Sequence, residues 1–160
     1  MPKYSNVKVS LLTTPEEKKK ALDVRIAVFV TEQKYPLETE IDGLDDDAVH
    51  FAAIADKENE DGTIEKDVFI GTVRLLHASD TTAKLGRLAV LSEARGLYAG
   101  QLLVKAFLEY AKTNGYQSVV LHSQYPRRGF YNKLGFVIEE GEEIFDEDGT
   151  PHIRMWKRSL

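Results

Sequence analysis

A short glycine-containing segment has residue types that can hold a phosphate group. Residues 95–101, Arg-Gly-Leu-Tyr-Ala-Gly-Gln, follow the apolar residues 88–90 and precede an amphipathic segment. A strand that turns into a helix in this way points unbonded backbone N–H groups and the positive end of the helix dipole at one place. Gly96 and Gly100 allow close approach of the backbone, and Arg95 adds a positive charge. The pattern suits a pyrophosphate, although plain connections between elements share it.

Side chains that could move a proton lie elsewhere in the chain. Tyr131 has a hydroxyl that can donate a hydrogen bond, although an isolated Phe-Tyr pair more often packs in a core. His122 follows the apolar residues 119–121, and histidine is the side chain that titrates near neutral pH. The competing bases lie upstream and are Glu32, Glu38, Asp42 and His50. No metal site is expected, because no close pair or familiar ligand spacing occurs among His50, His77, His122 and His152.

The composition limits the partners and the compartment. With 21 Lys and Arg against 26 Asp and Glu, the net charge of −5 argues against nucleic acid and favours a cationic partner. The absence of cysteine excludes disulfides, thiolate metal sites and a cysteine nucleophile, so any acyl transfer must be direct. No apolar run reaches membrane-spanning length, and residues 1–10 lack the apolar core of a secretory signal. We expect no membrane partner and a cytoplasmic protein, with access to the nucleus left open.

Apolar periodicity predicts the elements that must position these groups. Thr13 or Thr14 is the expected N-cap of a helix that begins at Pro15 and runs to about Val30. The acidic residues 32–47 are expected to form a loop or a broken helix, with Asp45 to Asp47 in solvent. Alternation of apolar residues predicts strands over 7–12, 50–55, 69–76, 84–90, 119–121, 136–139 and 152–156, and helical spacing predicts helices over 100–114 and 127–134.

The resulting order, β-α-β-β-β-α-β-α-β-β, is typical of an α+β fold with a mixed, mainly antiparallel sheet. A chain of 160 residues is long enough to bury one sizeable core. It contains no internal repeat and no low-complexity linker. We therefore expect one domain that covers residues 1–160.

Several of these segments together resemble the GCN5-related N-acetyltransferase family. The turn Arg95-Gly96-x-x-x-Gly100 after Leu88-Ala89-Val90, and the downstream residues 130–136, Phe-Tyr-Asn-Lys-Leu-Gly-Phe, are similar to its two cofactor-binding motifs. The ElaA-like branch of the family is resembled by residues 27–33 with Asp42 and His50, by residues 71–75 and by residues 149–155. The resemblance covers about residues 7 to 156.

The resemblance implies a sheet flanked by helices in which two central parallel strands splay apart. It implies acetyl-coenzyme A as co-substrate, with an amide of Leu88 or Val90 stabilising the oxyanion and Tyr131 protonating or hydrogen-bonding the departing thiolate. The base would be His122, Glu32 or a water-relayed group. The expected cofactor-binding residues are Leu88, Ala89, Val90, Arg95, Gly96, Leu97, Tyr98, Ala99, Gly100, Gln101, Gln124, Tyr131 and Lys133.

One residue departs from the family pattern. The usual turn has a glycine where this chain has Tyr98, so either that position tolerates a side chain or pyrophosphate binding is weakened.

The resemblance implies an enzyme that moves an acetyl group from acetyl-coenzyme A to a primary amine. The acidic residues 32–47 favour a small cationic acceptor. A peptide or protein lysine is the alternative acceptor, and a non-catalytic acyl-coenzyme A sensor or interaction module is the alternative function. Dimers are common among similar proteins, so a homodimer is also considered.

Overall fold

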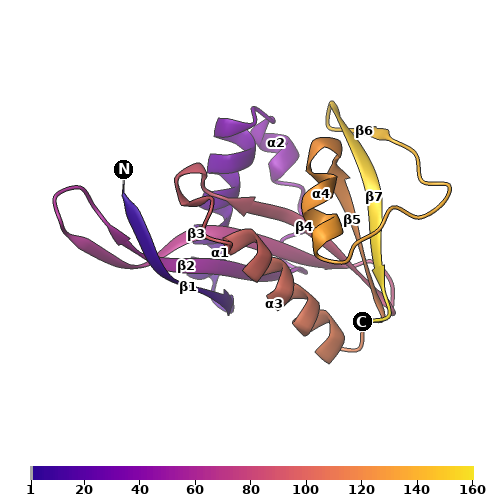
Figure 1. The fold of residues 1–160 in the computed structure, drawn as a ribbon, viewed down its shortest axis with the longest axis horizontal. Helices are drawn as coiled ribbons and strands as arrows, with labels where there is room; N and C mark the ends of the chain where they lie inside the picture. The colour runs from indigo at the N-terminus through magenta and orange to yellow at the C-terminus, as the bar shows by residue number, and fades with distance from the viewer. Residues whose placement is uncertain (1) are drawn as a thin grey trace.

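A seven-stranded sheet forms the centre of the protein (Figure 1), as seen in a computed structural model that describes residues 2–160. Its order is β1-β2-β3-β4-β5-β7-β6, and all neighbours are antiparallel except the parallel pair β4 and β5. The expected α+β class with a mixed, mainly antiparallel sheet is confirmed. The strands are β1 (Lys3–Leu11), β2 (Val49–Glu58), β3 (Ile64–His77), β4 (Thr82–Val90), β5 (Ser118–Gln124), β6 (Phe145–Glu147) and β7 (Thr150–Arg158).

The first helix begins at the N-terminal signal seen in the sequence. The first helix, α1 (Pro15–Arg25), has a capping box in which Thr14 and Glu17 each bond the other's backbone amide. It continues directly into a π-helix, Ile26–Glu32. The remaining helices are α2 (Leu37–Glu40), α3 (Ala99–Thr113) and α4 (Arg128–Lys133). Between residues 2 and 160, no helix combines the length and apolar character needed to cross a membrane.

Alternating side chains of β2 divide the core between the two faces of the sheet. Phe51 and Ala53 belong to the large cluster that contains Phe107 of α3. Ala52, between them in sequence, packs instead with Ala21 of α1. Because successive residues of a strand point to opposite faces, α1 and α3 cover opposite faces of the sheet.

Pairing between the two parallel strands ends halfway along their length. Within residues 2–160, β4 and β5 pair only from Thr82 with Ser118 to Leu85 with Leu121. Beyond that point β4 stays paired with β3, and β5 stays paired with β7. The inner edges of β4 and β5 therefore separate while their outer edges are held. The implied splay between two central parallel strands is present.

A bulge marks the place where the splay begins. The register between β3 and β4 shifts after Gly86, and Arg87 adopts a left-handed φ of 54°. A bulge of this kind bends the strand and increases its local twist. It turns the end of β4 away from β5.

Three sequence predictions need correction. The strand predicted over 136–139 is wrong, because Val137 forms only an isolated bridge with Trp156 and β6 takes the place beside β7. Gly141, with φ of 91°, turns the chain before a ladder can extend. The helix predicted to reach Val30 changes to the π form at Ile26. The strands predicted over 50–55 and 69–76 are too short, because β2 and β3 extend into a hairpin around residues 59–63.

Candidate active site

A cavity of about 770 Å³ opens where β4 and β5 separate. Its walls come from the end of β4, the turn after it, the start of α3, the end of β5, α4 and the turn between β6 and β7. Leu88, Gly100, His122 and Tyr131, which are far apart in the sequence, all line it. The fold thus brings most of the predicted site residues to one place.

Not all of the predicted site residues line the cavity. The predicted cofactor residues that line it are Leu88, Ala89, Val90, Arg95, Gly96, Ala99, Gly100, Gln101, Gln124 and Tyr131. Leu97, Tyr98 and Lys133 are not among its lining residues, and neither is the candidate base Glu32.

The turn before α3 keeps its backbone donors available. The amides of residues 96–101 donate no hydrogen bond to any residue between 2 and 160. The first bond of α3 runs from the Leu102 amide to the Tyr98 carbonyl, so the amides before Leu102 have no partner within the helix. Gly96, Ala99, Gly100 and Gln101 line the cavity. This end of the cavity therefore offers several amide donors and the positive end of the α3 dipole to an anion.

Tyr98 adopts the backbone conformation that usually calls for glycine. Its φ is 61°, in the left-handed region, and its side chain is 71% exposed. A non-glycine residue in this conformation costs on the order of 1 kcal/mol. The position therefore tolerates a side chain, which points into solvent and leaves the turn open.

The exposed edge of β4 presents alternate backbone groups to the cavity. The Leu91 amide donates to the Ile70 carbonyl of β3 over 2.8 Å. Since N–H groups alternate between the two edges of a strand, the amides of Leu88 and Val90 point the other way, toward the separated edge. Arg95 Nε reaches the Val90 carbonyl on that side, at 3.2 Å. The edge that β5 leaves unpaired is thus available to an extended ligand.

Glu32 and Arg95 neutralise each other. The Arg95 guanidinium donates two hydrogen bonds to the Glu32 carboxylate, at 2.7 and 2.8 Å. The hydrogen bond from Arg95 lowers the pKa of Glu32, so this carboxylate is a weaker base than an ordinary glutamate. Arg127, which the sequence analysis missed, lines the same end of the cavity and forms no ion pair with residues 2–160.

His122 lies immediately after the last β4–β5 pair and lines the cavity. Its Nδ1 atom lies 2.8 Å from Oε1 of Glu147, at the end of β6. The neighbouring Gln124 donates from Nε2 to the Gln33 side-chain oxygen over 2.8 Å and ties β5 to the end of the π-helix. The expectation that His122 lies beside the splay is confirmed, whereas Glu147 was missed because its position depends on the β6–β7 turn.

Tyr131 is held in an aromatic setting on α4. Its ring packs edge-on against Phe130 and Phe136, with centroid distances of 5.1 and 6.0 Å. Burial raises the pKa of Tyr131, so its hydroxyl keeps its proton throughout the neutral range. The hydroxyl has no hydrogen-bonding partner among residues 2–160. It can therefore donate to a ligand atom in the cavity.

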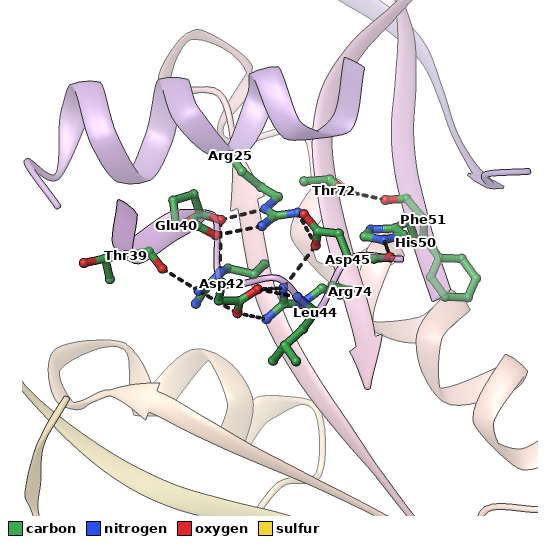
Figure 2. Close-up of polar contacts among 11 residues, drawn as sticks. Arg25, Thr39, Glu40, Asp42, Leu44, Asp45, His50, Phe51, Thr72 and Arg74 are labelled. Carbon is green, nitrogen blue, oxygen red and sulfur yellow. Dashed lines mark hydrogen bonds and ion pairs between the residues drawn. The ribbon is translucent and has the colours of Figure 1, made fainter. Parts of the chain in front are cut away.

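Figure 2 shows an ion-pair network, of which Glu40, Asp42, Arg74 and Arg87 line the cavity. Arg25, only 1% exposed, contacts Glu40 at 2.7 Å and Asp45 at 2.8 Å. The same carboxylates are shared by two further arginines. Arg74 contacts Asp42 and Asp45, and Arg87 contacts Glu40 and Asp42, at distances of 2.9 to 3.2 Å.

This network corrects two expectations about the acidic segment. The prediction that Asp45 lies in solvent is wrong, because it bonds Arg25 and Arg74. The carboxylates of Glu40, Asp42 and Asp45 are balanced by the three arginines. The segment therefore attracts a cation less than its sequence suggested.

The chain is similar in sequence to known acetyltransferases. The sequence profile of the acetyltransferase (GNAT) family matches residues 19–136. The uncharacterised N-acetyltransferase YjcF of Bacillus subtilis (strain 168) is 33% identical over 151 residues, which cover 94% of this chain and 99% of YjcF. Protein ElaA of Escherichia coli (strain K12) is 32% identical over 139 residues, which cover 84% of this chain and 82% of ElaA.

Solved structures share the fold. The crystal structure of Escherichia coli ElaA has a TM-score of 0.77 and 27% identity, and the match covers 96% of this chain and 100% of that one. An aminoglycoside 6'-N-acetyltransferase complexed with coenzyme A has a TM-score of 0.69 at 15% identity, over 96% of this chain and 97% of its own. The second likeness concerns the fold alone.

The network predicts a large loss of stability on replacing Arg25. Arg25→Met should lower the free energy of unfolding by about 3 kcal/mol, because Glu40 and Asp45 each lose a buried partner. Arg154, which is 46% exposed and 3.7 Å from Glu142, provides the control, and Arg154→Met should cost less than about 1 kcal/mol. Urea unfolding measures both values, and equal losses would contradict a stabilising network.

Asp42 should make stability depend on pH below about 4. Burial alone would raise the pKa of Asp42, but hydrogen bonds from Arg74 and the Leu44 amide lower it to about 2. A depressed pKa gives stability that is complete above the unfolded-state value and lost as pH falls through the folded-state value. Urea unfolding between pH 6 and pH 2.5 should show a loss of about 2 kcal/mol from this group, absent in Asp42→Asn. The same pH dependence in both proteins would contradict this assignment.

Proposed function

Because the chain belongs to the acetyltransferase (GNAT) family, we propose that it transfers an acetyl group from acetyl-coenzyme A directly to a primary amine. The observation that carries this proposal is the separated β4–β5 edge beside a turn whose amides at residues 96–101 are unbonded. The family and the similarity to ElaA support an N-acyltransferase. The use of acetyl-coenzyme A as the acyl donor is the more specific statement that we propose.

The two unbonded surfaces fit the two chemical parts of the cofactor. The diphosphate would accept hydrogen bonds from the amides of residues 96–101. The positive charge beside it would come from Arg127, because the charge of Arg95 is already neutralised by Glu32. The pantetheine amides would pair with the open edge of β4 at residues 88–90. With the pantetheine bound in this way, the thioester would lie near the bulge, close to His122 and Tyr131.

The reaction needs a proton acceptor, an oxyanion donor and a proton donor. A cationic amine first loses one proton to solvent. The neutral amine then attacks the thioester carbon, and the carbonyl oxygen becomes an oxyanion that the amide of Leu88 or Val90 can stabilise. His122 takes the proton that the amine nitrogen loses. The C–S bond then breaks, and the thiolate takes a proton from Tyr131. The products are an N-acetyl amine and free coenzyme A.

The acceptor that we propose is a small primary amine that arrives as a cation. The acidic residues 32–47, which suggested a cationic acceptor in the sequence, no longer support it, because arginines neutralise Glu40, Asp42 and Asp45. Other carboxylates support it instead. Glu147 and Asp148 at the β6–β7 turn are carboxylates that line the cavity near His122. These carboxylates could attract a cationic amine to the part of the cavity that contains His122.

Two measurements test the proposed function as a whole. Isothermal titration with acetyl-coenzyme A should show binding, and a panel of small amines should then give thiol release with at least one member. Absence of binding would overturn the assignment. Binding without thiol release from any amine or lysine peptide would favour a sensor.

Tyr131→Phe should lower kcat by about 100-fold and change the Kd for coenzyme A by less than about threefold. The substitution removes only the hydroxyl that donates a proton to the thiolate and keeps the ring against Phe130 and Phe136. Tyr110→Phe, in the α3 core beside Phe51, is the matched control and should leave both constants unchanged. Equal losses in kcat and affinity would rule out a proton-donor role.

Gly100→Asp should raise the Kd for coenzyme A at least about tenfold. The new carboxylate would repel the diphosphate, and a Cβ atom here would lie 3.3 Å from the Phe130 ring. Gly100→Ala separates bulk from charge and should have the smaller effect. Thr113→Asp adds the same charge at the exposed far end of α3 and should change nothing. An unchanged Kd in Gly100→Asp would mean that the diphosphate binds elsewhere.

A further inference from the structure

A tight hairpin carries Glu147 to the cavity. Asp148 and Gly149 form its two-residue turn, and both have positive φ, of 55° and 86°. Such a turn fixes the register of the flanking strands, so that Glu147 lies opposite Thr150. β7 in turn pairs with β5 from His152 to Arg158, which brings the end of β6 to His122.

The His122 ring is restrained by two contacts from this hairpin. Its Nδ1 lies 2.8 Å from Oε1 of Glu147, and its face meets the edge of Phe145 at a centroid distance of 5.0 Å. The second carboxylate oxygen of Glu147 lies 3.6 Å from His152 Nε2. One carboxylate is thus shared between two imidazoles, with His122 the closer.

The contact with Glu147 decides which nitrogen of His122 can act as a base. An ionised carboxylate only accepts hydrogen bonds, so the Nδ1 atom facing it must carry the proton. The hydrogen bond from His122 lowers the pKa of Glu147, which keeps this carboxylate ionised. In neutral His122 the lone pair is then on Nε2. That atom makes no hydrogen bond with residues 2–160.

We propose that Glu147 is a positioning residue that holds His122 with its Nε2 lone pair available to the attacking amine. The role rests on the proposed function, in which His122 accepts the amine proton. As the N–C bond forms, the proton leaves the amine nitrogen for Nε2, and Nδ1–H stays bonded to Glu147. The resulting imidazolium is stabilised by the adjacent carboxylate, and the proton passes to solvent after the product leaves.

Other charged groups also face this pair. His152 shares Glu147 from β7, and Lys84 of β4 lies near enough to lower the pKa of Glu147. Arg154, the β7 residue paired with His122, is engaged by Glu142 at 3.7 Å. Removing the Glu147 charge leaves mostly cationic or neutral neighbours. The stability of the imidazolium should therefore fall.

Two substitutions separate orientation from charge. Glu147→Gln keeps an oxygen that can accept from Nδ1–H but loses the charge, whereas Glu147→Ala loses both. We expect kcat with the best amine to fall at least about tenfold in Glu147→Ala and less in Glu147→Gln, with KM for acetyl-coenzyme A unchanged. The acid limb of the kcat/KM profile should move to lower pH in Glu147→Gln, since the base has become weaker. Glu139→Gln, a surface carboxylate paired with Arg158, is the control.

NMR titration of the His122 ring provides a readout that needs no turnover. In the neutral His122 ring, the proton should shift partly from Nδ1 to Nε2 in Glu147→Ala and less in Glu147→Gln, which keeps an accepting oxygen beside Nδ1. An active wild type with unchanged kcat and pH profile in both variants would overturn the role of Glu147 while leaving the proposed function intact. A wild type that releases no thiol from any amine would overturn the proposed function itself, whatever the titration shows.

Discussion

The loss of pairing between β4 and β5 after Leu85 and Leu121 is the constraint on which the site depends. Each strand remains bonded on its other side, β4 to β3 and β5 to β7, so the gap cannot close by a local shift. An unpaired strand edge inside a protein is costly unless its backbone groups find partners. Here the edge lines a cavity, and a ligand that carries amides can pair with it. The same separation exposes His122 on one side and the amides before α3 on the other.

The arginine network connects this edge to α1 and α2. Arg87 lies in the β4 bulge with a left-handed φ, and its side chain is bonded by Glu40 and Asp42. Arg25 bonds Glu40 from α1, which ties the helix to the same carboxylate. Buried ion pairs of this kind contribute little net stability compared with apolar packing, but breaking one is costly. The network is therefore better understood as fixing one arrangement of α1, α2 and the bulge than as a source of attraction for cations.

Patterns local to one segment were predictable from the sequence, and contacts between distant segments were not. The α+β class, the glycine turn and the place of His122 after an apolar strand followed from short-range periodicity and turn chemistry. The pairs Arg95–Glu32 and His122–Glu147 join residues 63 and 25 positions apart, and periodicity carries no information about them. The strand predicted over 136–139 was wrong for a related reason. Val137 reaches β7 only at Trp156, and the segment that forms a ladder with β7 is β6, which the turn at Gly149 folds back onto residues 150–152.

In the proposed reaction, the donor and acceptor sides of the cavity are built from different kinds of groups. The donor side uses backbone amides, whose direction depends on φ and ψ and hardly on the side chain. This explains how Tyr98 can replace a glycine, because its backbone takes the left-handed conformation and its side chain lies in solvent. The acceptor side uses side chains from α2, β5 and the β6–β7 hairpin, and a single substitution there changes its charge. If the proposed function holds, this fold can keep the same donor site while a change in a few side chains alters which amine it accepts.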